Sequence, residues 1–237
     1  MIAAGLLLVA VGGVDLVRRL VPGRRIVAFV IAAAVLVALS AGADAIVAGL
    51  LAVAVAAIWT WVVPESGPAR AGLWPVGLLG VAAAACVVVA PARPSPGLLG
   101  AVWVAYGPRE GLSVDVLFLV AGCLLFLLES GNAVVRIALR AEMGERVAPS
   151  TGDAPGTLRG GRLIGPLERI LVFALTLAGA YTLLAAVLAA KGIVRFPEIS
   201  RDGEGGDRAE YFLIGSLVSW VTALAAAFLV WWGVGGV

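Results

Sequence analysis

From residue 113 to residue 143 the sequence reads S-V-D-V-L-F-L-V-A-G-C-L-L-F-L-L-E-S-G-N-A-V-V-R-I-A-L-R-A-E-M. Nearly all of residues 113–128 are apolar, and this run approaches the ~20 residues that a helix needs to cross a bilayer. No proline separates it from residues 129–143, in which polar and apolar side chains recur with helical spacing. The stretch predicts one long helix that crosses a membrane and continues beyond it.

The composition extends this prediction to the whole chain. Of its 237 residues, 62% are hydrophobic and 14% are charged, whereas soluble domains are about half apolar and a quarter charged. Further apolar runs occupy residues 2–17, 26–40, 46–63, 73–90, 167–190 and 211–232. We therefore predict an all-α, polytopic transmembrane helical bundle of about seven spans.

A proline-rich segment, residues 91–97, divides the chain. The nine residues 98–106 that follow are apolar but too few to cross the membrane core, and they predict a short re-entrant or interfacial segment. We expect an N-terminal region of four spans, residues 1–97. A C-terminal region of three spans, residues 98–237, carries the polar motifs.

Missing residue types exclude several classes of function. The chain has no histidine, which removes zinc hydrolases, His-ligated haem proteins and Ser-His-Asp catalysis. Cys86 and Cys123 lie inside apolar runs without a CxxC motif, so we interpret them as small hydrophobic residues and predict no metal site. No segment between the spans is long enough for a nucleic-acid-binding domain, so we predict no nucleic-acid partner.

The clearest polar motif follows the span at 113–128. Glu129, Asn132, Arg136 and Arg140 are spaced by 3, 4 and 4 residues, which places them on one stripe of a helix. Two guanidinium groups on one stripe favour an anion site that holds a phosphate or carboxylate at the cytoplasmic boundary. The alternative is a juxtamembrane helix with ordinary positive-inside arginines.

A second motif lies at the start of the sixth predicted span. Arg162 precedes Gly165 and Pro166, and Glu168 and Arg169 then enter the apolar run. Charges at a span entrance need partners inside the bundle, and Glu129 or its stripe would supply them. The alternative is a structural salt bridge that ties the fifth span to the sixth.

A third motif is a second polar cluster made of Lys191, Arg195, Glu198, Glu210 and Tyr211. If the sixth span is straight, this cluster lies on the opposite membrane face from Arg136 and Arg169. One compact site is then excluded unless a segment folds back into the bundle.

Small residues recur every fourth position in the last two predicted spans. They are Ala178, Thr182 and Ala186 on the sixth span and Gly215, Ser219 and Ala223 on the seventh. Such stripes allow transmembrane helices to approach closely, so we expect the two stripes to face each other.

The basic residues predict an orientation. Alternate loops collect eleven Lys and Arg residues on one side and six on the other, and the richer side is cytoplasmic by the positive-inside rule. The N-terminus is then outside and the C-terminus cytoplasmic. Five tryptophans form an expected cytoplasmic aromatic belt, namely Trp59, Trp61, Trp74, Trp231 and Trp232.

Three ordered blocks lie in the C-terminal part: G-R-L-I-G-P-L-E-R at 161–169, A-K-G-I-V-R-F-P-E-I at 190–199 and A-E-Y-F-L-I-G-S-L-V-S at 209–219. With them, residues 129–229 resemble an uncharacterised family of bacterial integral membrane proteins, a domain of unknown function. The first four spans do not share this resemblance. It implies a location in the bacterial plasma membrane and no reaction.

Three functions are consistent with these motifs. The first is binding, with or without processing, of an anionic lipid or lipid-linked phosphate at the cytoplasmic interface. The seven residues predicted for this anion site are Glu129, Asn132, Arg136, Arg140, Arg162, Glu168 and Arg169. No cofactor is predicted for it, and Mg²⁺ would enter only with phosphate chemistry. The second is a non-enzymatic scaffold or subunit with a protein partner or a second copy of the chain. The third is a small transporter.

Overall fold

A computed structural model describes residues 1–21, 23–63, 72–89, 96–107, 113–143, 161–199 and 207–235. Within these ranges all regular secondary structure is helical, which confirms the predicted all-α class. The elements are α1 (Ile2–Leu20), α2 (Arg25–Gly42), α3 (Ile46–Val62), α4 (Trp74–Val88), α5 (Gly97–Tyr106), α6 (Val114–Leu125), the π-helical turn η1 (Phe126–Ser130), α7 (Gly131–Met143), α8 (Gly161–Leu177), α9 (Tyr181–Ile199) and α10 (Asp207–Gly235).

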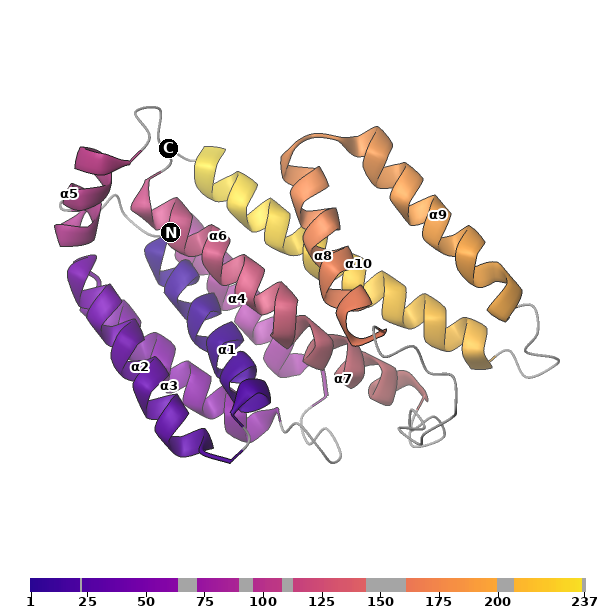
Figure 1. Ribbon diagram of the computed structural model, residues 1–237, viewed down its shortest axis with the longest axis horizontal. Helices are drawn as coiled ribbons and strands as arrows, with labels where there is room; N and C mark the ends of the chain where they lie inside the picture. Colours follow the sequence, from indigo (N-terminus) through magenta and orange to yellow (C-terminus); the bar gives the residue numbers. More distant parts are fainter. Residues whose placement is uncertain are drawn as a thin grey trace.

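The long helices run up and down between two ends of one bundle (Figure 1). We call the end where α1, α3, α7 and α9 finish the basic end, and the opposite end the terminal end. Both chain termini lie at the terminal end, where the Met1 amino group donates to the Cys86 carbonyl at 3.4 Å. A Cβ on Gly233 would lie 3.4 Å from the Met1 sulfur. The two ends of the described chain therefore lie at the same end of the bundle, whereas the orientation predicted from the sequence places the termini on opposite membrane faces.

Helices α1 and α6 approach each other most closely at glycines, where a side chain would meet the backbone of the other helix. A Cβ on Gly12 would lie 2.7 Å from backbone atoms of Leu125 and Phe126, and one on Gly122 would lie 2.6 Å from the Gly5 carbonyl oxygen. Because real Cβ atoms do not approach backbone atoms so closely, glycine is required at these positions for this spacing. Small residues at an interface are the usual means of close helix packing in membranes.

Three helices in the described ranges are long and apolar enough to cross a membrane, fewer than the seven that we expected. They are Arg25–Gly42, Val114–Glu142 and Ala209–Gly235. The second is the long helix predicted from residues 113–143, formed by α6, η1 and α7 without a break. Helices α3 and α4 are shorter, with 17 and 15 residues, against about 20 for a full crossing. Helix α1 has 19 residues but contains Asp15, Arg18 and Arg19.

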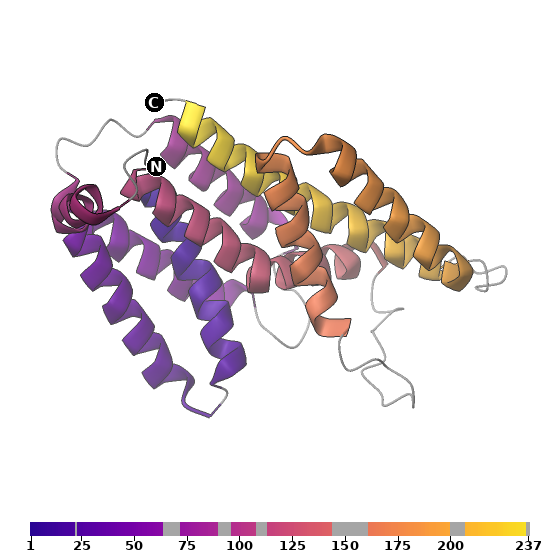
Figure 2. The same cartoon turned by 45° about the horizontal axis from the view of Figure 1, so that its top comes forward.

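The prediction of one span over residues 167–190 is wrong, because two helices, α8 and α9, share this run. The chain turns back after α8, and α9 runs antiparallel to it (Figures 1 and 2). Gly179 has φ +66°, its N–H donates to the Thr176 carbonyl, and the Ala180 N–H donates to the Leu175 carbonyl. These two bonds form a Schellman motif, which ends a helix at a left-handed glycine. The apolar run conceals this stop because no polar residue marks it.

Helix α5 begins and ends at the terminal end, beside the turn between α2 and α3 (Figure 1). Gly97 has φ +68°, and a Cβ there would lie 2.6 Å from the backbone of Gly42 and Ala43. With ten residues the helix is about 15 Å long. Its length and place agree with a segment that does not cross.

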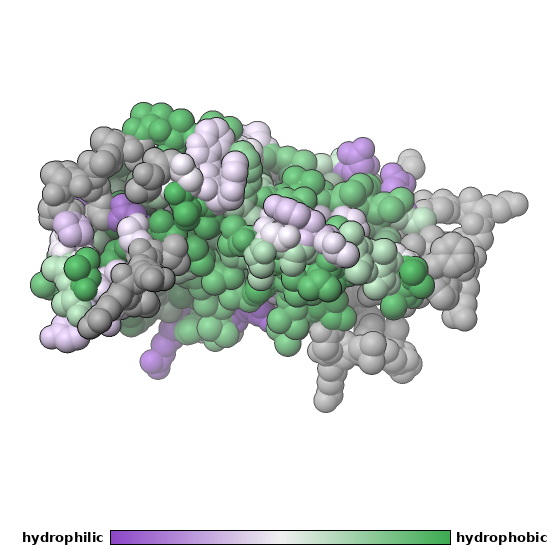
Figure 3. Space-filling view, turned by 90° about the horizontal axis from the view of Figure 1, so that it is seen from above, coloured by the Kyte–Doolittle hydropathy of each residue, from purple (hydrophilic) through white to green (hydrophobic). Residues whose placement is uncertain are grey.

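The outer surface of the bundle is largely apolar. Only Leu36 and Ser40 of α2 are buried, although the helix is almost wholly hydrophobic. Ile26 is 81% exposed and Val81 is 68% exposed, and hydrophobic residues cover most of the described surface in Figure 3. Contiguous apolar surface on this scale is rare in soluble monomers.

The glycine contacts of α1 give a direct stability test. Gly12→Ala should lower the free energy of unfolding by about 1–3 kcal/mol, because the added methyl group forces α1 and α6 apart. Gly13→Ala is the matched control, since a Cβ there meets nothing within 4 Å. Thermal unfolding in mild detergent measures both, and equal melting temperatures for the two variants would contradict the packing described.

Candidate functional site

The candidate site forms around the π-helical turn η1. There the N–H of Gly131 donates to the Phe126 carbonyl, five residues back, instead of to Leu127, four residues back. The Leu127 carbonyl instead accepts a hydrogen bond from Arg169 Nε at 2.8 Å. Single π-helical turns inside α-helices occur often at functional sites. Here the turn directs a backbone carbonyl at a charged side chain from another helix.

Arg169 is the most deeply buried charged residue in the described part of the chain, with 2% of its surface exposed. Besides its bond to Leu127, its guanidinium donates to Asn132 Oδ1 at 2.5 Å. A Cβ on Gly131 would lie 2.7 Å from Arg169 Nε, so glycine at 131 leaves room for the arginine. Arg169 therefore ties α8 to η1 and α7.

Asp15 of α1 is a second centre of polar contacts, and its side chain is only 12% exposed. Its Oδ2 accepts from Ser130 Oγ at 2.6 Å and from Trp59 Nε1 at 3.1 Å, and its Oδ1 lies 3.4 Å from Arg18. The positive charges of Arg18 and Arg136 also act on this carboxylate. Asp15 thus joins α1, α3 and η1.

Two arginines at the end of α1 extend this network. Arg18 donates to the carbonyl of Val63 at 3.1 Å and to that of Thr60, which satisfies carbonyl groups at the C-terminal end of α3. Arg19 pairs with Glu129 of η1. Arg18 therefore connects α1 to the end of α3, and Arg19 connects α1 to η1.

On the far side of α8, Glu168 accepts from Lys191 Nζ of α9 at 2.5 and 2.6 Å. It also accepts from Trp220 Nε1 of α10 at 2.6 Å. The Lys191 ammonium lies 5.4 Å from the Trp220 ring centre and 5.5 Å from that of Phe212, distances typical of cation–π contacts. One carboxylate therefore joins α8, α9 and α10.

We call these connected groups the polar layer. It contains Asp15, Arg18, Arg19, Trp59, Glu129, Ser130, Asn132, Glu168, Arg169, Lys191 and Trp220. Its three carboxylates each contact a basic side chain, and the fourth cation, Arg169, is held by neutral acceptors. Such partners are the condition for burying charges inside an apolar bundle. Among the described residues, no group of three His, Cys, Asp or Glu side chains could hold a metal ion.

The structure brings together four of the seven residues predicted as the anion site. Glu129, Asn132, Glu168 and Arg169 all belong to the polar layer, but they bind protein groups. Arg136 and Arg140 are partly buried, and the side chain of Arg162 lies outside the described part. The alternative interpretation expected a salt bridge between these two helices, whereas Arg169 ties them by hydrogen bonds to Asn132 and to the Leu127 carbonyl.

The α8–α9 turn changes the position of the second polar cluster. Lys191 reaches Glu168, so this cluster lies on the same side of the bundle as Arg169 and not on the opposite face. Glu210 is exposed at the basic end and Tyr211 is half-buried. The side chains of Arg195 and Glu198 lie outside the described part.

The two small-residue stripes do not face each other. Ala178, Thr182 and Ala186 are exposed, whereas Ser219 and Ala223 are buried. A Cβ on Gly215 would lie 3.8 Å from Val135 of α7, so part of the α10 stripe packs on α7. The expected pairing failed because it assumed that the sixth span is straight.

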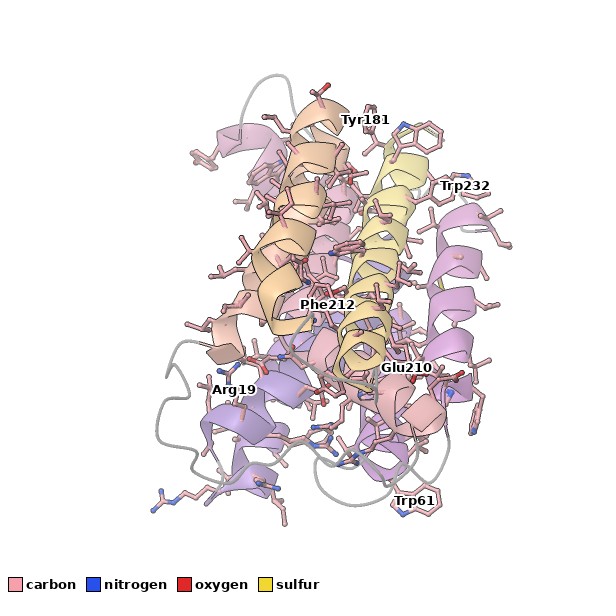
Figure 4. The ribbon with its side chains drawn as sticks, turned by 90° about the vertical axis from the view of Figure 1, so that its right-hand side faces the viewer. Arg19, Trp61, Tyr181, Glu210, Phe212 and Trp232 are labelled. Atoms are coloured by element: carbon pink, nitrogen blue, oxygen red, sulfur yellow. The ribbon has the colours of Figure 1, made fainter. Side chains whose placement is uncertain are left out.

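The tryptophans mark both ends of the bundle rather than one cytoplasmic belt. Figure 4 shows Trp61 at the basic end and Trp232 toward the terminal end, the end at which Tyr181 also lies. Trp59 points inward, where it is 4% exposed and bonded to Asp15. The single belt failed because the chain makes one more reversal than expected.

Sequence reasoning missed several members of the polar layer, namely Asp15, Arg18, Arg19, Trp59, Ser130 and Trp220. Asp15 had a visible signal, because an acidic residue inside an apolar run needs a partner. The others carried none, since arginines after a span and tryptophans near one are ordinary. Both cysteines are free, and Cys123 is buried against the Ala226 carbonyl.

No family model matches the chain, and neither does any curated protein or solved structure. The resemblance seen in residues 129–229 therefore stays a prediction.

The Trp59 bond gives a test of the polar layer. Trp59→Phe should lower the free energy of unfolding by about 1.5–3 kcal/mol, because it removes a hydrogen bond to a charged group. Trp61→Phe is the control, since Trp61 is 77% exposed. Thermal unfolding of both variants in detergent should show a clear difference, and comparable losses would argue against Asp15 as a centre of the network.

Proposed function

We propose that this protein is a multi-pass bacterial inner-membrane protein, most of whose long helices lie in the bilayer. Three helices are able to cross, and the apolar exterior would otherwise face water. A chain with both termini at one end makes an even number of crossings, so seven spans do not fit this fold. The α8–α9 turn supplies the additional reversal.

We propose further that the basic end faces the cytoplasm. Every Lys and Arg in the described ranges lies toward this end or near the middle of its helix, and they are Arg18, Arg19, Arg24, Arg25, Arg136, Arg140, Arg162, Arg169, Lys191, Arg195 and Arg208. This distribution of the described basic residues agrees with the positive-inside rule. Both termini would then lie outside.

Cysteine labelling tests this topology. In a chain whose native Cys86 and Cys123 are replaced by alanine, Glu142→Cys and Glu210→Cys should both resist a membrane-impermeant thiol reagent added to intact cells. Tyr181→Cys, 66% exposed at the other end, should react. Permeabilised cells give the control for accessibility. If Glu210→Cys reacted like Tyr181→Cys, the reversal at Gly179 would be wrong.

The function that the geometry supports best is binding of an anionic lipid or a lipid-linked phosphate at the basic end. The observation that carries this proposal is the concentration of the described basic residues at one end of an otherwise apolar bundle. Each basic residue near an anionic membrane surface contributes about 1 kcal/mol of attraction. The phosphate of a lipid at the basic end would meet several guanidinium groups.

Within this end, Arg136 and Arg140 are better candidates for a headgroup than Arg169. Arg169 is buried, with 2% of its surface exposed, whereas the two α7 arginines are only partly buried. Arginine suits this task because its planar guanidinium can hold a phosphate with two parallel bonds. Processing of the lipid, with or without Mg²⁺, would be a further step beyond binding.

Lipid retention tests the proposal. Protein extracted in mild detergent should carry more phosphatidylglycerol than phosphatidylcholine by mass spectrometry, and Arg136→Gln with Arg140→Gln should reduce this enrichment by about tenfold or more, as the loss of two such contacts implies. Glu142→Gln on the same helix is the control and should not reduce it. Competition by inorganic phosphate would indicate that the phosphate group alone is recognised.

Two outcomes would count against lipid binding. Unchanged enrichment in the double arginine variant would show that the basic end is only a topology signal. A stoichiometric co-purifying protein without lipid enrichment would favour the scaffold or subunit alternative. That alternative has its own support in the exposed small residues Ala178, Thr182 and Ala186.

A further inference from the structure

An apolar groove lies between α1 and α2, and α2 contributes no residue to the polar layer. Its volume is about 220 Å³, and its lining includes Val9 and Val17 of α1, Phe29 and Leu39 of α2, Val53 of α3 and Leu125 of α6. Helices α1 and α2 stand side by side and are joined at the basic end (Figures 1 and 2).

The groove is suited to hydrocarbon and not to water or a polar molecule. Its lining residues are Ala, Val, Leu, Phe and Gly, and a water molecule needs two or more polar partners. Val35 and Leu39 on its rim are 54% and 38% exposed, so the groove communicates with the outside of the bundle. A molecule in the surrounding lipid can therefore enter from the side.

The length of the groove matches one leaflet. Along α2 the lining runs from Phe29 to Leu39, which is about 15 Å at 1.5 Å per residue. Half of a ~30 Å hydrocarbon core has the same thickness. A single acyl chain that enters at the basic end would fill this length and finish near the middle of the bilayer.

Basic residues of α2 lie beyond one end of the groove lining. Phe29 lies one helical turn from Arg25. Arg24, the N-cap residue of α2, is exposed, and the N-terminal end of a helix itself favours an anion. A phosphate placed one turn beyond the end of the apolar lining would therefore meet Arg24 and the start of α2.

We propose that this groove binds one acyl chain of an anionic phospholipid from the leaflet at the basic end, with the phosphate at Arg24. The site lies between α1 and α2, apart from the arginines of α7, and it rests on the proposed anionic-lipid function. The apolar lining selects a hydrocarbon chain, the length selects one leaflet, and the arginine selects a negative headgroup. The lipid would brace α2, which buries few residues of its own.

A photoactivatable phosphatidylglycerol with a diazirine in its acyl chain tests the site in the full chain, reconstituted in phosphatidylcholine vesicles. Peptides from α1 and α2 that line the groove should carry the label. Gly13→Leu should reduce this labelling by about fivefold or more, because the leucine side chain would occupy the groove. Gly13 lines the groove, and a Cβ there meets nothing within 4 Å. Gly80→Leu on α4, equally open, should leave it unchanged.

The contribution of the Arg24 charge is tested separately. Arg24→Gln should reduce labelling of the groove by about fivefold, which corresponds to one basic contact with an anionic lipid. A second probe carries the same diazirine on phosphatidylcholine. It should label the groove of the native chain only weakly, to the extent that the phosphatidylglycerol probe labels the Arg24→Gln variant. Equal labelling of the native chain by both probes would overturn the headgroup assignment.

The outcomes also separate this site from the α7 arginines. Loss of labelling in Gly13→Leu, with lipid enrichment still sensitive to Arg136 and Arg140, supports both proposals. Labelling unaffected by Gly13→Leu, or confined to helices outside the groove, overturns the groove site while the general proposal stands. Groove labelling that persists when Arg136→Gln and Arg140→Gln have no effect on enrichment overturns the α7 site alone.

Discussion

The burial of Arg169 constrains the rest of the structure. A guanidinium with 2% of its surface exposed loses its hydration, and that cost must be offset by acceptors held in place around it. The acceptors are the Leu127 carbonyl, which the π-helical turn leaves without its usual partner, and Asn132 one turn later. Gly131 must lack a side chain for the arginine to fit. The irregular turn, the glycine and the charge therefore depend on one another.

The same constraint gives the bundle its register. Apolar helices in a membrane can slide or rotate at little cost, because lipid tails and neighbouring side chains are equally apolar. Paired charges remove this freedom, since a shift of one turn would separate Asp15 from Ser130, or Glu168 from Lys191. The glycine contacts between α1 and α6 then fix the distance between helices. The charge pairs thus determine how the helices are aligned along their length, and the glycine contacts determine how far apart they lie.

The two halves of the chain would contribute differently to the proposed lipid binding. The C-terminal half uses its buried charges for internal contacts, and its partly buried arginines Arg136 and Arg140 lie on α7 at the basic end. The N-terminal half has few internal charges outside Asp15, Arg18 and Arg19, and its open space is the apolar groove beside α2. A phospholipid combines the two chemistries that this end of the molecule presents, a hydrocarbon chain and an anionic phosphate.

Apolar length and helical spacing are local properties, so they were sufficient to predict the helical class and the long helix over residues 113–143. They also identified four of the residues that make polar contacts, namely Glu129, Asn132, Glu168 and Arg169. The reversals of the helices and the pairing of the charges depend instead on tertiary packing. Gly179 ends α8 inside an apolar run, and hydropathy carries no sign of a left-handed residue. The partners of Asp15 come from α3 and η1, tens of residues away in the chain, so their meeting depends on packing that no local pattern records.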